Sequence, residues 1–90
     1  MLQNRAEPRK VLMARVDVLW DDEGTSHAAP AMLEDRSANG AGIRLGKPIT
    51  VGTKLHIRGQ RQEFSGIVRH CRRDGLGYVV GIQCDLAHSL

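Results

Sequence analysis

Hydrophobic and polar residues alternate with a period of two in the first long segment of the chain, residues 11–20. Its apolar residues occupy every second position: Leu12, Ala14, Val16, Val18 and Trp20. Arg15 and Asp17 fall between them and face the other way. An α-helix would need apolar residues three and four positions apart, so the pattern predicts a half-buried β-strand.

Shorter segments of the same kind follow, separated by stretches that contain glycine, asparagine or aspartate. They predict five further strands, at residues 31–33, 42–45, 54–58, 63–71 and 78–84. Residues 21–26 are interpreted as a polar loop around Gly24. Pro30 is placed near the start of the second strand, where its missing N–H is tolerated. Gly66 predicts a bulge or tight bend in the fifth.

Six short strands with turn residues between them predict an all-β fold, a six-stranded antiparallel β-barrel. Closure of the barrel removes the open strand edges that would otherwise promote aggregation. The chain is predicted to be a single domain, residues 1–90, in which residues 11–85 form the barrel. Residues 1–10 are expected to be a flexible arm, because Pro8 disfavours a helix there. With five residues after Asp85, little or no C-terminal helix is expected.

Composition narrows the class of protein further. With 90 residues and 41% hydrophobic residues, the chain suits one small folded domain and is too apolar for a disordered segment. No apolar run approaches the ~18 residues of a membrane span, and the N-terminus lacks the apolar stretch of a secretory signal. We therefore expect a cytoplasmic protein without membrane insertion. Its net charge of +3 makes an anionic partner plausible.

Neither a metal site nor a catalytic site is predicted. Cys71 and Cys84 lie on successive strands, and a hairpin would place Cys84 opposite a position near Ile67, ~13 Å along the strand from Cys71. That distance excludes a disulfide, so both cysteines are interpreted as buried small hydrophobic residues. The four histidines show no ligand spacing with them. The chain also lacks a nucleophile elbow, a phosphate-binding loop and a zinc-protease motif, and we expect no enzyme.

Two segments carry chemistry suited to a ligand. Arg5 and Arg9 precede the first strand, and guanidinium groups bind phosphates and the O6/N7 edge of guanine. Asp35, Ser37 and Gly40 lie between the second and third strands and offer a carboxylate, a hydroxyl and a bare backbone amide. Taken singly, each segment is better explained without a ligand, the first as a solvated tail and the second as a well-formed turn.

Together the two segments resemble the motifs of the PilZ domain family: Arg-x-x-x-Arg before the first strand, then Asp-x-Ser-x-x-Gly between the second and third. The resemblance continues over nearly the whole chain, through residues 42–45, 51–55, 66–68 and 80–82. It implies a bacterial receptor for the second messenger cyclic di-GMP. In this family such domains are adaptors that regulate a protein partner in motility, biofilm or polysaccharide processes.

The resemblance also implies roles for the individual residues. Arg5 and Arg9 would clasp the ligand, Asp35 would accept hydrogen bonds from guanine, and Ser37 and Gly40 would complete the pocket. Binding would fold the arm over the barrel and change the surface shown to a partner. The family commonly has phenylalanine where Cys84 stands. Asn4, ahead of the first arginine, leaves open whether one ligand or a stacked pair is held.

Two alternatives stay open at this stage. One is a small basic barrel that binds RNA or single-stranded DNA, but such barrels stack bases on exposed aromatic rings. This chain has one Phe, one Trp and one Tyr, and Trp20 and Tyr78 are assigned to core-facing positions. The other is a PilZ-like protein-interaction module that has lost ligand binding. Its expected mark would be missing arginines or a broken loop motif, and both motifs are intact.

Overall fold

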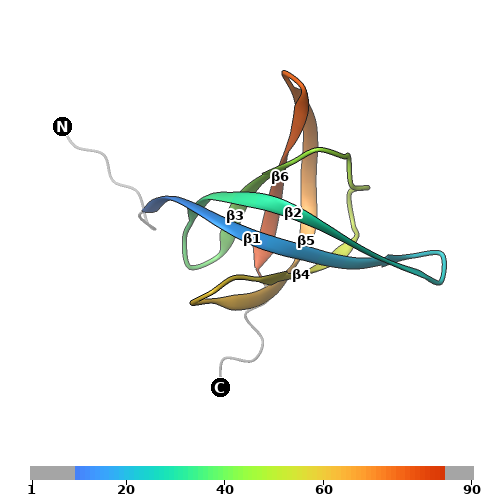
Figure 1. Cartoon of the computed structure of the whole chain (residues 1–90), viewed down its shortest axis with the longest axis horizontal. Helices are drawn as coiled ribbons and strands as arrows, with labels where there is room; N and C mark the ends of the chain where they lie inside the picture. Colours follow the sequence, from blue (N-terminus) through green and yellow to red (C-terminus); the bar gives the residue numbers. More distant parts are fainter. Residues whose placement is uncertain (1–9, 85–90) are drawn as a thin grey trace.

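In the computed structural model the described part of the chain is residues 10–84, and it forms one closed antiparallel barrel (Figure 1). Its strands are β1 (Lys10–Asp22), β2 (Thr25–Arg36), β3 (Gly40–Leu45), β4 (Lys54–Arg58), β5 (Glu63–Asp74) and β6 (Gly77–Cys84). Around the barrel they follow the order β1-β2-β3-β6-β5-β4. The predicted all-β, six-stranded antiparallel barrel is confirmed. Within residues 10–84 no helix is long and apolar enough to cross a membrane.

The β1–β2 hairpin is longer than predicted. Residues 21–26 are no loop, because Asp21 pairs with Ser26 and Asp22 with Thr25 across the two strands. The turn itself is Glu23–Gly24, with φ angles of 51° and 83°. Two successive positive φ angles match the right-handed twist of the flanking strands and allow this two-residue connection. The pairing therefore runs almost to the tip of the hairpin, where no apolar alternation remains to reveal it.

Pro30 lies in the middle of β2 rather than near its start. It sits opposite Asp17 on β1, whereas the pairing of β2 with β3 begins only at Met32. Pro30 therefore occupies a stretch of β2 with a single partner strand among the described residues. The absent N–H costs no ladder hydrogen bond on the open side.

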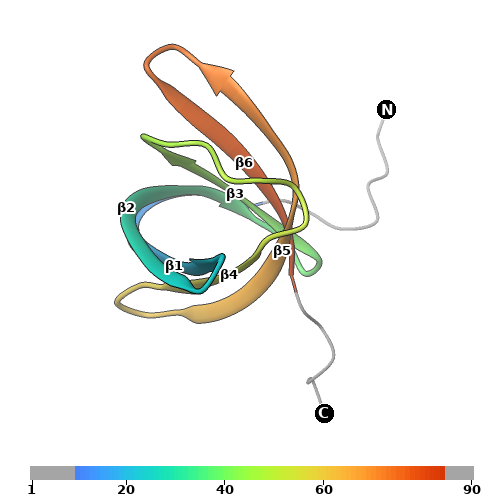
Figure 2. The same ribbon diagram turned by 90° about the vertical axis from the view of Figure 1, so that its right-hand side faces the viewer.

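The core fills the inside of the barrel with aliphatic side chains from every strand. Those with no exposed surface are Val18, Leu33, Ile43, Leu55, Ile57, Val68 and Val80. Val16 and Val18 are buried while Asp17 is exposed, which confirms the predicted facing of the first strand. Trp20 and Tyr78 are only half-buried, and Trp20 packs against the core. The β5–β6 hairpin extends past the barrel (Figure 2).

Gly66 is not a bulge. It pairs regularly with Cys84, and the irregularity in β5 lies further on, between Val68 and His70. Gly66 is buried, and a Cβ there would overlap the Gln83 carbonyl oxygen and the Ile82 side chain. Glycine is required at this position by the close approach of β5 and β6.

The two cysteines are both free. Cys71 pairs with Val80, and Cys84 pairs with Gly66, one residue from the predicted position. Cys84 is buried as predicted, whereas Cys71 is only half-buried. Burial raises the pKa of the Cys84 thiol, an effect that the nearby Arg36 charge partly opposes. Cys84 is therefore a protonated hydrophobic residue of the core.

Candidate functional site

The predicted loop motif lies at one end of the barrel, where β2 turns into β3. The amide N–H of Ser37 donates to the Gly40 carbonyl oxygen at 2.9 Å and closes a tight turn. The Cys84 amide N–H donates to the carbonyl oxygen of Asn39, also at 2.9 Å. This second bond ties the turn to the end of β6 and holds the motif against the barrel wall.

The Asp35 carboxylate lies across the neighbouring strand. Asp35 pairs with Gly42 on β3, and a Cβ built on Gly42 would stand 3.2 Å from Oδ1 and 3.3 Å from Oδ2. The carboxylate therefore rests on the bare backbone of Gly42. A larger residue than glycine at position 42 would push it away.

Gly42 and Gly81 form a two-glycine platform on the outside of the barrel. Gly42 pairs with Gly81 on β6, and the flanking residues Ala41, Ile43, Val80 and Ile82 all point into the core. Since side chains alternate along a strand, both glycine positions face outward. A Cβ on Gly81 would overlap the imidazole ring of His70, so this ring lies over Gly81 as the Asp35 carboxylate lies over Gly42. The two glycines thus make room for these two side chains on the outer face of the barrel.

A shallow pocket of about 250 Å³ opens beside this platform. Its walls are Ser37, Asn39, Gly40, Ala41, Arg69, His70, Gly81, Ile82 and Gln83. Arg69 Nε donates to Gln83 Oε1 at 2.6 Å, which orients the guanidinium group along β6. The irregularity between Val68 and His70 leaves both Arg69 and His70 exposed, so these two consecutive side chains both lie on the outer face of the barrel.

Arg36 follows Asp35 and fixes the end of β2. Its Nη1 donates to Gln62 Oε1 at 2.8 Å, and its guanidinium carbon lies 3.7 Å from the centre of the Phe64 ring. A hydrogen bond and a cation–π contact together attach this strand end to the β4–β5 connection. Arg36 therefore positions its neighbour Asp35 and is itself engaged in packing.

The structure brings part of the predicted site together and adds residues to it. Ser37 and Gly40 share one pocket, and Asp35 borders the adjoining platform. Arg5 and Arg9 lie outside the described residues. The sequence interpretation missed Arg69, His70 and Gln83 as site residues, as well as the pairing of Gly42 with Gly81. The available signal was the consecutive polar pair Arg69–His70, which breaks the alternation of its strand.

Chemically, the arrangement suits a polar, anionic ligand. The Asp35 carboxylate can accept hydrogen bonds from ring N–H groups, and the Arg69 guanidinium offers charged donors to a phosphate. No group of histidines, cysteines and carboxylates within residues 10–84 could hold a metal ion.

Comparison with known proteins places the chain in a family. The sequence profile of the PilZ domain matches residues 3–89, which is essentially the whole chain. A search among curated proteins returned no match. The chain therefore belongs to the PilZ domain family. PilZ domains are ligand-binding and adaptor domains rather than enzymes, and they are generally receptors for cyclic di-GMP.

Proposed function

We propose that this protein is a cytoplasmic cyclic di-GMP receptor that binds its ligand beside the Gly42–Gly81 platform. The observation that carries the proposal is the gathering of Asp35, Ser37 and Arg69 around this platform and its adjoining pocket at one end of the barrel. Each of these groups matches a feature of the ligand, which has two planar guanines and two phosphates. Membership of the PilZ family supports the same ligand.

In this proposal the arm completes the site. Lys10, the first described residue, pairs with Arg36, so the chain enters the barrel beside the Asp35–Gly40 loop. Arg9 is the preceding residue, within one Cα–Cα step of ~3.8 Å. Arg5 and Arg9 would contact guanine edges and phosphates, and Arg69 would add a further charge for a phosphate. The ordered arm would then present a changed surface to a protein partner.

Calorimetric titration of the full chain with cyclic di-GMP tests the proposal. We expect saturable binding, with a stoichiometry that decides between one ligand and a stacked pair. GTP and a short RNA serve as controls, and both should bind far more weakly. Tighter binding of the RNA would support a nucleic-acid-binding barrel instead, and no binding of any of the three would leave a protein-interaction module.

Asp35 is expected to provide guanine specificity. The N1–H and N2–H groups of guanine can donate to its carboxylate, whereas adenine lacks both donors and would leave a charged acceptor unpaired. Cyclic di-AMP should therefore bind much more weakly than cyclic di-GMP to the natural protein. Asp35→Ala should narrow this difference, chiefly by weakening the guanine ligand.

Competition titrations of both dinucleotides against both proteins measure that difference. Asp22→Ala is the matched control, since it removes the same charge at the opposite end of β1 and should preserve discrimination. Equal binding of the two dinucleotides by the natural protein would show that the site recognises charge and not the base.

A further inference from the structure

A second surface feature lies on the side of the barrel opposite to the Gly42–Gly81 platform, where β1 and β4 separate. β4 pairs with β1 only at residues 17–19, and the described chain provides no strand partner beside the preceding part of β1. A groove of about 690 Å³ lies between this part of β1 and the β4–β5 connection, residues 59–62. This volume lies within the range of ligand-sized cavities, ~300–1,000 Å³. Its lining is Ala14, Arg15, Val16, Asp17, Arg58, Gly59, Gln60, Arg61 and Gln62.

Three arginines line this groove, and all three are exposed: Arg15, Arg58 and Arg61. None of them forms an ion pair or a side-chain hydrogen bond with another described residue. Among the described residues the one carboxylate in the lining is Asp17, opposite Arg58 on the paired strands. The groove thus carries a net positive charge.

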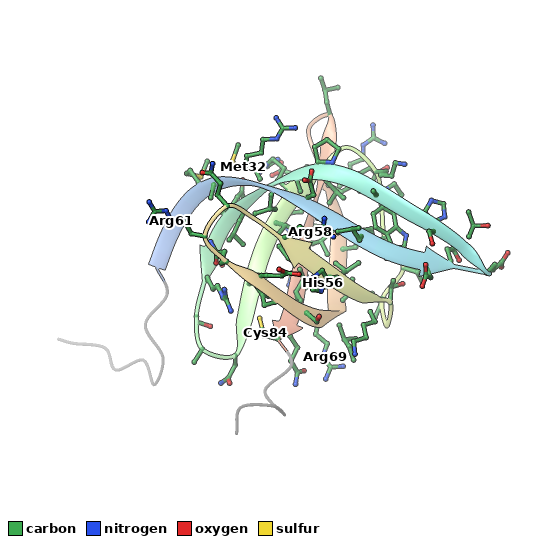
Figure 3. All side chains as sticks on the ribbon, turned by 60° about the horizontal axis from the view of Figure 1, so that its bottom comes forward. Met32, His56, Arg58, Arg61, Arg69 and Cys84 are labelled. Carbon is green, nitrogen blue, oxygen red and sulfur yellow. The ribbon has the colours of Figure 1, made fainter. Side chains whose placement is uncertain are left out.

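Three other arginines of the barrel are already engaged, whereas Arg72 and Arg73 are exposed on the β5–β6 hairpin. Arg44 donates to Glu34 and Asp74 at 2.8 and 2.9 Å, and its bond to Asp74 lowers the pKa of that carboxyl. Arg36 and Arg69 have the partners described above. The groove therefore concentrates guanidinium groups that the described part of the fold leaves available. Figure 3 shows Arg58 and Arg61 well apart from Arg69, so the groove is separate from the ligand site.

The backbone next to these arginines is suited to an extended chain. The edge of β1 that faces the groove lacks a partner strand at Ala14 and Arg15 among the described residues. Such an edge can pair with an added strand through main-chain hydrogen bonds. The open edge ends at Val16, because a Cβ on Gly59 would stand 3.1 Å from Val16 Cγ1 and Gly59 therefore lies beside Val16. An added strand would lie along the part of β1 that precedes Val16.

We propose that this groove docks an extended acidic segment of a partner protein by strand addition along β1. Alternate side chains of the segment would point outward at a spacing of ~6.6–6.8 Å, where carboxylates can accept bidentate hydrogen bonds from the arginines. Nucleic acid fits less well, because no aromatic ring from residues 10–84 lines the groove to stack a base. The proposal stands apart from cyclic di-GMP binding, since it uses none of the residues assigned to that site.

The probe is a capped heptapeptide, Thr-Glu-Val-Glu-Val-Glu-Thr, titrated at low ionic strength into the full chain labelled with ¹⁵N. We expect saturable amide shifts confined to residues 14–17 and 58–62. The same peptide with glutamine in place of glutamate should bind at least about 10-fold more weakly, because it loses the charge-assisted hydrogen bonds. Added salt should weaken binding of the acidic peptide.

Two double variants distinguish specific binding of the peptide in the groove from general attraction by the positive charge of the protein. R58Q/R61Q should weaken the acidic peptide at least about 10-fold. R72Q/R73Q removes the same number of charges from exposed arginines on the β5–β6 hairpin and should leave the affinity unchanged. Melting curves of both variants check that the barrel is intact.

The outcomes that overturn the proposal are distinct. Absence of saturable shifts in the groove would mean that the arginines only protect an open strand edge. Equal loss in both double variants would mean that net charge alone attracts the peptide. A short RNA that occupies the groove more tightly than the peptide would replace the proposed partner. Cyclic di-GMP titration of R58Q/R61Q should match the natural protein, so failure of ligand binding and failure of peptide docking are recorded separately.

Discussion

Leu33→Ala is expected to lower the free energy of unfolding by about 2–5 kcal/mol, because it removes a fully buried side chain and leaves a cavity. Leu33 pairs with Ala14 on β1 and with Ile43 on β3. Small domains have a total stability of ~5–15 kcal/mol, so the loss is a large share of it.

Urea denaturation of the variant and the natural protein measures this change, and an unaltered slope would show that the unfolded state is unaffected. Leu76→Ala is the matched control, since Leu76 is 98% exposed at the tip of the β5–β6 hairpin. It should change stability by less than ~0.5 kcal/mol. Comparable losses in both variants would contradict the assignment of the core.

Arg9→Ala and Arg5→Ala are each expected to weaken cyclic di-GMP about 5- to 150-fold, which corresponds to ~1–3 kcal/mol. The physical reason is the loss of a guanidinium that makes charge-assisted or bidentate contacts in the proposed complex. The melting temperature without ligand should stay the same, because both residues precede the barrel strands. Calorimetric titration with parallel melting curves measures both quantities.

Arg58→Ala is the control for these two variants, because it removes the same charge from β4, where Arg58 pairs with Asp17, seven residues along β1 from Lys10. It should leave the affinity within about twofold of the natural value, because seven residues at ~3.3 Å each exceed the Debye length of ~8–10 Å. An unchanged affinity in Arg5→Ala and Arg9→Ala would remove the arm from the site. A large drop in melting temperature would instead give those arginines a structural role.

The sequence predicted the fold well because a half-buried strand has a direct signature. Val16 and Val18 point inward and Asp17 outward as the alternation requires, and the fourth strand was placed at its observed residues, 54–58. The errors occurred where the signature fades. β2 begins six residues earlier than predicted, because the paired arms of a hairpin beyond the core have no buried side to impose alternation. Gly66 was interpreted as a bulge or tight bend, since a lone glycine in a strand does not show whether the strand bends there or packs closely against its neighbour.

At the candidate site, the sequence identified the residues that lie close together along the chain. The tertiary structure decided which residues from other strands join them. Asp35, Ser37 and Gly40 are close in sequence, so one turn holds them together and a motif could identify them. The platform pairs Gly42 with Gly81, and the pocket adds Arg69 from a third strand. The groove is likewise lined by Arg15 together with Arg58 and Arg61, which come from a distant part of the chain. Neighbours far apart in the chain depend on strand order and register around the closed barrel, and these follow from how the whole core packs.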